Sequence, residues 1–194
     1  MFKYQDLHQY YTRFCPISDD NWRRLEAELK PVSFDKGQAL VRQNQPTPNL
    51  FAIREGVVRT FYTTPDGKEV VKIFLTEGQI VSPYNENISG QPPRATSEAV
   101  TPVQAIRIPF ARLMQILDSS NELMRLHLRL VQSFYAAKEK REYEFLTLDA
   151  TERYQLFLQE FEPYVDQIPH MYVASYIGVT PVSLSRLRKK LKDR

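Results

Sequence analysis

The residues best suited to chemistry lie near the end of the sequence, in the stretch VASYIGVTPVSLSRLRKKLK at residues 173–192. Four cationic side chains are closely spaced there: Arg186, Arg188, Lys189 and Lys190. Guanidinium and ammonium groups pair with phosphate, and arginine also binds the major-groove edge of guanine. The stretch therefore indicates an anionic partner, and it is either a helix-turn-helix that inserts into DNA or a basic amphipathic tail in solvent.

The charge of the chain is concentrated at the same end. Residues 170–194 contain six Lys or Arg residues and one acid, Asp193, whereas residues 1–169 contain 20 cationic and 22 acidic residues. The net charge of +3 is thus divided into about +5 at the end and about −2 before it. This asymmetry indicates an anionic partner for the C-terminal stretch, with a solvated basic tail as the alternative.

A helix-turn-helix needs two short helices that cross closely at a tight turn. Ala174 is small enough to allow the crossing, and Gly178 four residues later fits the turn. Thr180 can cap the second helix, and Pro181 suits its first turn. The apolar positions that would form the core between the helices are Val173, Ile177, Val179, Leu184 and Leu187. An ordinary helical hairpin has the same apolar spacing and remains the alternative.

If the stretch is a helix-turn-helix, its second helix carries the side chains that face DNA. We expect these residues to be Thr180, Pro181, Val182, Ser183, Ser185, Arg186, Lys189 and Lys190.

Composition indicates an ordinary soluble globular protein, since 42% of the 194 residues are hydrophobic and 25% are charged. The sequence has no apolar run long enough to span a membrane and begins without a secretory signal. Its one cysteine, Cys15, excludes an internal disulfide and cysteine-ligated zinc or iron–sulfur sites. We therefore expect a cytoplasmic protein that makes no contact with a membrane.

Between Pro31 and Ile108 the pattern predicts many short strands, which is typical of an antiparallel barrel or jelly roll. Pro65-Asp66-Gly67 predicts a tight hairpin turn, and residues 82–93 are expected to form one long connection. The predicted strands lie in GQALV, NLFAIREG, VVRTFYTT, KEVVKIFL, TEGQIV, ATSEAV and VQAIRI.

Helices are predicted on both sides of the barrel, so the fold class is α+β. Ser18 can cap an early helix, and a long helix is predicted from Asn121 to about Leu148. Its apolar stripe is Leu123, Leu126, Leu130, Phe134 and Ala137, which can pair with a second chain or pack on the barrel. Asp149 and Glu152 predict a capping box and a hinge. The expected domains are 1–120, 121–148 and 149–194.

The order of these parts resembles the Crp/Fnr family of bacterial transcription regulators over nearly the whole chain. The resemblance is carried by REGVVRTFYTTPDGKEV, TERYQLFLQEF and IPHMYVASYIGVTPVSLSRLRKKL, and the last is similar to a Bacteroidetes subgroup with a short C-terminus. It implies a cyclic-nucleotide-binding-like jelly roll, a long dimerisation helix and a truncated winged-helix domain. It also implies a homodimer on two-fold double-stranded DNA, with RNA polymerase and a small effector as further possible partners.

The resemblance places the three base-reading positions of the cAMP-responsive members on Pro181, Val182 and Arg186. Only Arg186 can pair with a guanine edge there, at about 1–3 kcal/mol of discrimination, whereas Val182 can touch a thymine methyl group. We therefore expect a DNA sequence different from that of those relatives.

The cyclic-nucleotide cassette of the family matches poorly. Its Gly-Glu pair corresponds to Ser82-Pro83, its Arg-Ser/Thr-Ala run to Arg94-Ala95-Thr96 one residue late, and its long-helix hydroxyls to Ala137 and Lys138. Cyclic AMP is thus not expected, and the open alternatives are another effector or none. The residues expected to line such a pocket are Ser82, Tyr84, Arg94, Thr96, Ser97, Ala137 and Lys138.

Other functions fit the residues less well. Haem sensing needs an axial ligand, and His8, His127 and His170 all lie in predicted helices; for His127, on the long helix, a packed or capping role is expected. A metal-dependent barrel enzyme needs histidines on strands, and residues 31–108 contain none. Enzymatic activity, haem and iron–sulfur clusters are therefore not expected. The alternative function is a ligand-binding or protein-interaction module whose helix-turn-helix does not bind DNA.

Overall fold

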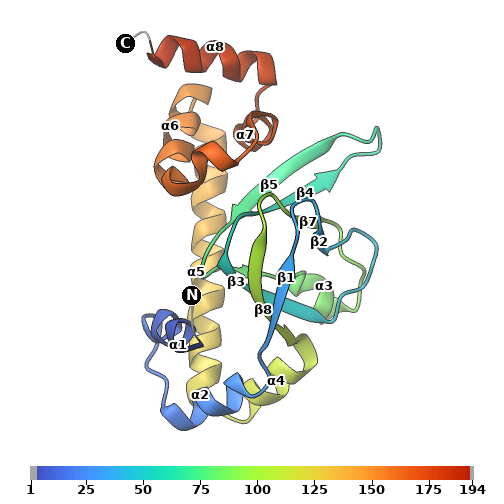
Figure 1. Cartoon of the computed structure of the whole chain (residues 1–194), viewed down its shortest axis with the longest axis vertical. Helices are drawn as coiled ribbons and strands as arrows, with labels where there is room; N and C mark the ends of the chain where they lie inside the picture. The colour runs from blue at the N-terminus through green and yellow to red at the C-terminus, as the bar shows by residue number, and fades with distance from the viewer. Residues whose placement is uncertain (1–3, 193–194) are drawn as a thin grey trace.

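The computed structural model describes residues 4–192, as a β-barrel beside one long helix with further helices at both ends of that helix (Figure 1). The helices are α1 (Tyr4–Thr12), α2 (Asp19–Glu26), α3 (Tyr84–Ser89), α4 (Phe110–Asp118), α5 (Asn121–Thr147), α6 (Ala150–Glu160), the 3-10 helix η1 (Glu162–Gln167), α7 (His170–Ile177) and α8 (Pro181–Lys192). The strands are β1 (Lys30–Phe34), β2 (Ala39–Val41), β3 (Asn49–Glu55), β4 (Val58–Thr63), β5 (Glu69–Leu75), β6 (Ile80–Val81), β7 (Thr96–Ala99) and β8 (Val103–Pro109).

Two four-stranded antiparallel sheets form the barrel, with strand orders β1-β8-β3-β6 and β2-β7-β4-β5. Apolar side chains from both sheets meet between them, among them Ile53, Val58 and Val103, which are fully buried. The structure thus confirms the predicted α+β class and the barrel of short strands. In the second sheet β5 is an edge strand, so one side of its backbone is free of strand partners.

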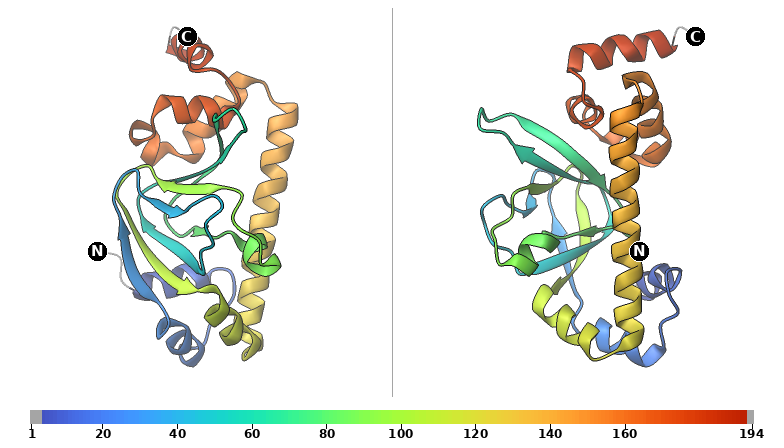
Figure 2. Two further views of the ribbon diagram at one scale, coloured as in Figure 1. Left: turned by 90° about the vertical axis from the view of Figure 1, so that its right-hand side faces the viewer. Right: turned by 180° about the vertical axis from the view of Figure 1, so that it is seen from behind.

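The hairpin of β4 and β5 projects from the barrel (Figure 2). Its turn is closed by hydrogen bonds from the Gly67 amide to the Thr64 carbonyl at 2.8 Å and from the Thr64 amide to the Lys68 carbonyl at 2.9 Å. Gly67 has φ +82°, a backbone conformation that glycine adopts without strain. The predicted turn at Pro65-Asp66-Gly67 is therefore confirmed.

The N-terminal helices cover one end of the barrel and the start of α5. Ser18 caps α2, whose buried Trp22 faces a core shared with Leu123 and Leu126 of α5. Leu130 packs against the same core. This half of the predicted dimer stripe is thus occupied within the chain, which was the alternative to pairing with a second chain.

The C-terminal helices do not form a separate core. Phe157, Phe161, Tyr176 and other side chains of α6 and α7 share one buried cluster with Val71 and Phe74 of β5. Because this cluster crosses the predicted boundary at Asp149, the division into 1–120, 121–148 and 149–194 stays a prediction. The capping box at Asp149 is confirmed, since Glu152 and Asp149 bond reciprocally to each other's backbone amide.

Two elements differ from the sequence prediction. Lys30–Phe34 forms β1, although Pro31 has no backbone amide hydrogen to donate to a sheet. The strand lies at the edge of its sheet, where a missing amide donor is tolerated. Residues 82–93 were expected to be one long connection, but they contain the short helix α3, which ends at Gly90 with φ +67°.

Candidate nucleic-acid interface

Helices α7 and α8 form a tight helical pair. Gly178 ends α7 with φ +76°, and the Val179 amide bonds to the Ala174 carbonyl at 2.9 Å. Thr180 caps α8, because its Oγ1 accepts from the Ser183 amide at 3.1 Å. Val173, Ile177 and Leu184 are buried as predicted, and Val179 and Leu187 pack beside them. This geometry is that of the predicted helix-turn-helix, with Gly178 at the turn.

All eight residues expected to face DNA are exposed. They are Thr180, Pro181, Val182, Ser183, Ser185, Arg186, Lys189 and Lys190. Leu184 and Leu187 turn the opposite face of α8 into the core, so the exposed side chains lie on its outer surface. Val182 is 61% exposed despite being apolar. The structure thus leaves the predicted surface of α8 open to a partner.

Arg188 is less exposed than Arg186, Lys189 and Lys190. It is half-buried, and its Nη1 lies 2.6 Å from Nε2 of His170, at the start of α7. This contact ties the two helices together and draws Arg188 away from the open surface. The sequence did not reveal this pairing, because the two residues are 18 positions apart.

The C-terminal end of α7 is held by two arginines from the long helix and its successor. Arg141 of α5 donates to the Tyr176 carbonyl and stacks 3.8 Å over the Tyr176 ring. Arg153 of α6 donates to the Ile177 carbonyl at 2.9 Å and also to the Leu148 carbonyl. Cations are favoured at this end of a helix by its dipole. These bonds fix the helix-turn-helix to α5 across the predicted hinge.

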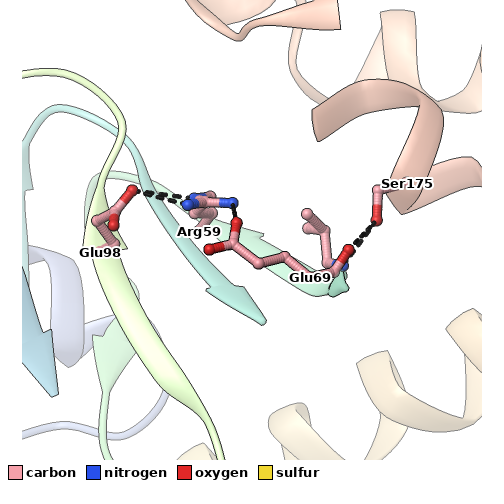
Figure 3. Close-up of polar contacts among 5 residues, drawn as sticks. Arg59, Glu69, Glu98 and Ser175 are labelled. Atoms are coloured by element: carbon pink, nitrogen blue, oxygen red, sulfur yellow. Dashed lines mark hydrogen bonds and ion pairs between the residues drawn. The ribbon is translucent and has the colours of Figure 1, made fainter. Parts of the chain in front are cut away.

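The opposite side of α7 is held by the barrel. Ser175 Oγ accepts from the Val71 amide at 2.9 Å and donates to the Glu69 carbonyl at 3.4 Å, so it fills the free edge of β5 (Figure 3). Nearby, the Arg59 guanidinium is paired with Glu69 at 2.5 Å and with Glu98 at 2.9 Å.

Arg59 also lies between two aromatic rings, since its Cζ is 4.1 Å from the ring centre of Phe61 and 3.8 Å from that of Tyr172 of α7. Sequence reasoning missed this contact. In the sequence, Arg59 is only a charged residue within the mainly apolar strand VVRTFY. The same pattern is typical of an exposed strand edge, so it does not indicate a buried arginine.

Only some of the residues expected to line an effector pocket lie close to one another. Ser97 Oγ lies 2.8 Å from Thr60 Oγ1, and Thr96 Oγ1 accepts from the Gln43 amide at 3.1 Å. Arg94 is largely exposed and pairs with Glu86 of α3 at 3.6 Å. The cassette residue that would hold a phosphate is therefore already paired with a carboxylate.

The long helix contributes a different residue to this region than expected. Tyr84 of α3 bonds through its hydroxyl to Nε2 of His127 at 2.8 Å. Ala137 and Lys138 are exposed further along α5, about 15 Å beyond His127 at ~1.5 Å per residue. The structure thus supports a packed role for His127, as expected. Among the described residues, the buried hydroxyl of Ser82 makes no hydrogen bond.

The described part of the chain is residues 4–192. In that part of the chain, no three His, Cys, Asp or Glu residues are grouped as metal ligands would be. None of its helices is both long enough and apolar enough to cross a membrane.

Known proteins resemble this chain in its barrel and, more distantly, over most of its length. Residues 31–120 match the model of the cyclic nucleotide-binding domain. The transcriptional activator protein Anr of Pseudomonas aeruginosa is 29% identical over 96 residues, which are 50% of this chain and 38% of Anr. Electron transport regulator A of Shewanella oneidensis is 21% identical over 169 residues, covering 81% of this chain and 66% of that protein. The chain spans less than two thirds of the length of either relative.

Solved structures share the fold over most of the chain. FixK2 from Bradyrhizobium japonicum has a TM-score of 0.73 at 17% identity, over 85% of both chains. The c-di-GMP responsive global regulator CLP of Xanthomonas campestris has a TM-score of 0.72 at 16% identity, over 91% of this chain and 92% of its own. The barrel, the long helix and the terminal helix pair thus occur in the same order as in these solved structures, and residues 31–120 match the cyclic nucleotide-binding domain.

Proposed function

We propose that this protein is a homodimeric DNA-binding transcription regulator in which α8 is the reading helix. The observation that carries the proposal is the outer surface of α8, where Arg186, Lys189 and Lys190 stand exposed over a packed helix-turn-helix. Arginine and lysine on such a helix pair with phosphates, and arginine also pairs with guanine. We propose no enzymatic activity. As a transcription regulator the protein would also interact with RNA polymerase.

The proposed dimer contact is an exposed face of α5. Leu128, Tyr135 and Leu146 are 54%, 63% and 76% exposed. They are seven and eleven residues apart, and 18 residues make five helical turns, so all three lie on one face. Phe134, a member of the originally expected stripe, is also exposed on the same helix. A second copy would cover this face and place two α8 helices for successive major grooves, about 34 Å apart.

The effector pocket is proposed to be degenerate and not to bind cyclic AMP. A cyclic nucleotide needs a carboxylate for its ribose and a free cation for its phosphate. Ser82-Pro83 provides no carboxylate, and Arg94 already pairs with Glu86. The Ser97 and Thr60 hydroxyls bond to each other inside the sheet. We propose that the barrel either binds a small effector other than cyclic AMP in this region or binds no effector.

The function is tested by binding of the purified full chain to genomic DNA fragments at increasing salt. The logarithm of the binding constant is expected to fall linearly with the logarithm of salt concentration, by about 0.9 per phosphate contact. Absence of salt-sensitive binding to every fragment would overturn the proposal. It would favour the alternative, a ligand-binding or protein-interaction module with a helix-turn-helix that does not bind DNA.

A further inference from the structure

We infer that Arg59 is a latch, a positioning residue through which the barrel holds the helix-turn-helix in place. Its side chain is almost fully buried, although it belongs to the barrel and not to the DNA-facing surface. The element that covers it is α7, through the Tyr172 ring 3.8 Å away. The latch therefore acts on α7, and the reading surface of α8 is left untouched.

The chemistry of this contact makes it a reversible one. Arg59 pairs with both Glu69 and Glu98, so its charge stays compensated whether or not α7 is present. Removal of the Tyr172 ring would return one face of the guanidinium to water, which solvates it well. The Ser175 contact is equally exchangeable, because water can replace its hydroxyl at the edge of β5. The Arg59 contact can therefore break without leaving an unpaired buried charge, while the apolar core shared by α7 and β5 keeps the two elements together.

The latch is also connected to the inner side of the sheet. Arg59 stands opposite Glu98 on β4 and β7, and the next opposed pair is Thr60 and Ser97. The hydroxyls of that second pair bond to each other at 2.8 Å. Any displacement of β7 against β4 therefore alters the hydroxyl pair and the Arg59–Glu98 ion pair together. The strand that carries the expected effector residues is thus linked to α7 through one side chain.

The test is hydrogen exchange of the full chain without DNA, comparing Tyr172→Leu with Tyr172→Phe. Leucine keeps apolar bulk but removes the aromatic face, so we expect exchange of the Val71 amide and of the α7 amides to accelerate about 3- to 30-fold, the range for loss of a cation–π contact. Phenylalanine keeps the ring and should leave this exchange unchanged. Equal exchange in the two variants would overturn the latch.

Two further variants test the barrel side of the contact. Arg59→Lys keeps the charge but removes the planar guanidinium that lies between the Phe61 and Tyr172 rings, and we expect it to accelerate the same amides while β3 and β8 stay protected. Glu98→Gln should accelerate them as well; unchanged exchange in this variant would overturn the link to β7. If Arg59→Lys also accelerates exchange in β3 and β8, the barrel itself is destabilised. The comparison of Tyr172→Leu with Tyr172→Phe then decides whether Arg59 is a latch. These measurements use no DNA, so their outcome is independent of whether the proposed function holds.

Discussion

Gly178 lies directly against the aromatic ring of Phe145, so that a Cβ atom on Gly178 would be 2.8 Å from two of its carbons. Gly178 ends the first helix of the helix-turn-helix, whereas Phe145 is in the last turns of the long helix. The turn between α7 and α8 is therefore also a place where α5 touches this helix pair. Glycine suits this position because of its positive φ, and any side chain there would also have to displace the ring of Phe145, which is 48% exposed.

We expect Gly178→Ala to destabilise the protein more than Gly67→Ala. Both residues have positive φ, at +76° and +82°, and a side chain in this conformation costs about 1–2 kcal/mol. A Cβ at Gly67 would meet no described atom within 4 Å, whereas one at Gly178 would overpack against Phe145, at a further cost of about 1–3 kcal/mol. Denaturant unfolding measures the difference.

The double variant Gly178→Ala with Phe145→Ala provides the control for this comparison. Measured against Phe145→Ala alone, which also loses the contacts of the ring with Arg141 and Arg153, Gly178→Ala should cost only the part that positive φ costs. Equal destabilisation by the two glycine substitutions would show that Phe145 yields without cost.

Arg186→Ala and Lys190→Ala should affect DNA binding differently. Arg186 is expected to pair with a guanine edge, so its loss should remove sequence preference at one position, by about 1–3 kcal/mol. Lys190 is expected to contact phosphate, so its loss should weaken binding on all sequences about equally and reduce the salt slope by about one. Binding to a set of single-base variants of one site measures both. Equal loss of preference in the two variants would contradict the assigned roles.

Leu146→Glu should prevent formation of the proposed dimer. Leu146 is 76% exposed on the face of α5 that also carries Leu128 and Tyr135, and a buried unpaired charge there opposes association. Ile88→Glu on α3 is the matched control, because Ile88 is 62% exposed but lies outside this face. Sedimentation at micromolar concentration reports the mass. A monomeric unmodified protein, or a Leu146→Glu dimer, would refute the dimer contact.

Stability should depend on His127 at mildly acidic pH. Burial lowers the pKa of His127 below its ordinary value of 6.5. The unfolded chain therefore binds a proton at a higher pH than the folded one, and the free energy of unfolding falls as pH drops below about 6.5. His127→Gln should flatten this decrease, whereas His8→Gln serves as the comparison. Unfolding curves between pH 5 and 8 test this, and an unchanged slope in His127→Gln would contradict it.

Local patterns predicted the elements well because the residues that define them are close in sequence. Ser18 and Asp149 cap helices by bonding within three residues, and the Thr64–Lys68 turn is closed by its own backbone. The buried face of the helix-turn-helix likewise follows from helical spacing. These features needed no information from distant parts of the chain.

The contacts between elements could not be predicted in this way. Ser175 bonds to β5 over a separation of 104 residues, and His127 meets Tyr84 over 43. The apolar stripe of α5 showed that the helix has a buried face, but not that Leu123 and Leu126 would face α1 and α2. Likewise, Arg59 in an apolar strand gave no sign that Tyr172 would cover it.

The core shared by β5 and α7 has a consequence for the order in which the chain folds. Synthesis proceeds from the N-terminus, so the barrel is complete before residues 154–184 leave the ribosome. During that interval Val71 and Phe74 lie on an uncovered apolar surface beside an unpaired strand edge. Such a surface can associate with other nascent chains. Arrival of the C-terminal helices removes this hazard, so the part of the protein proposed to read DNA also protects the barrel from aggregation.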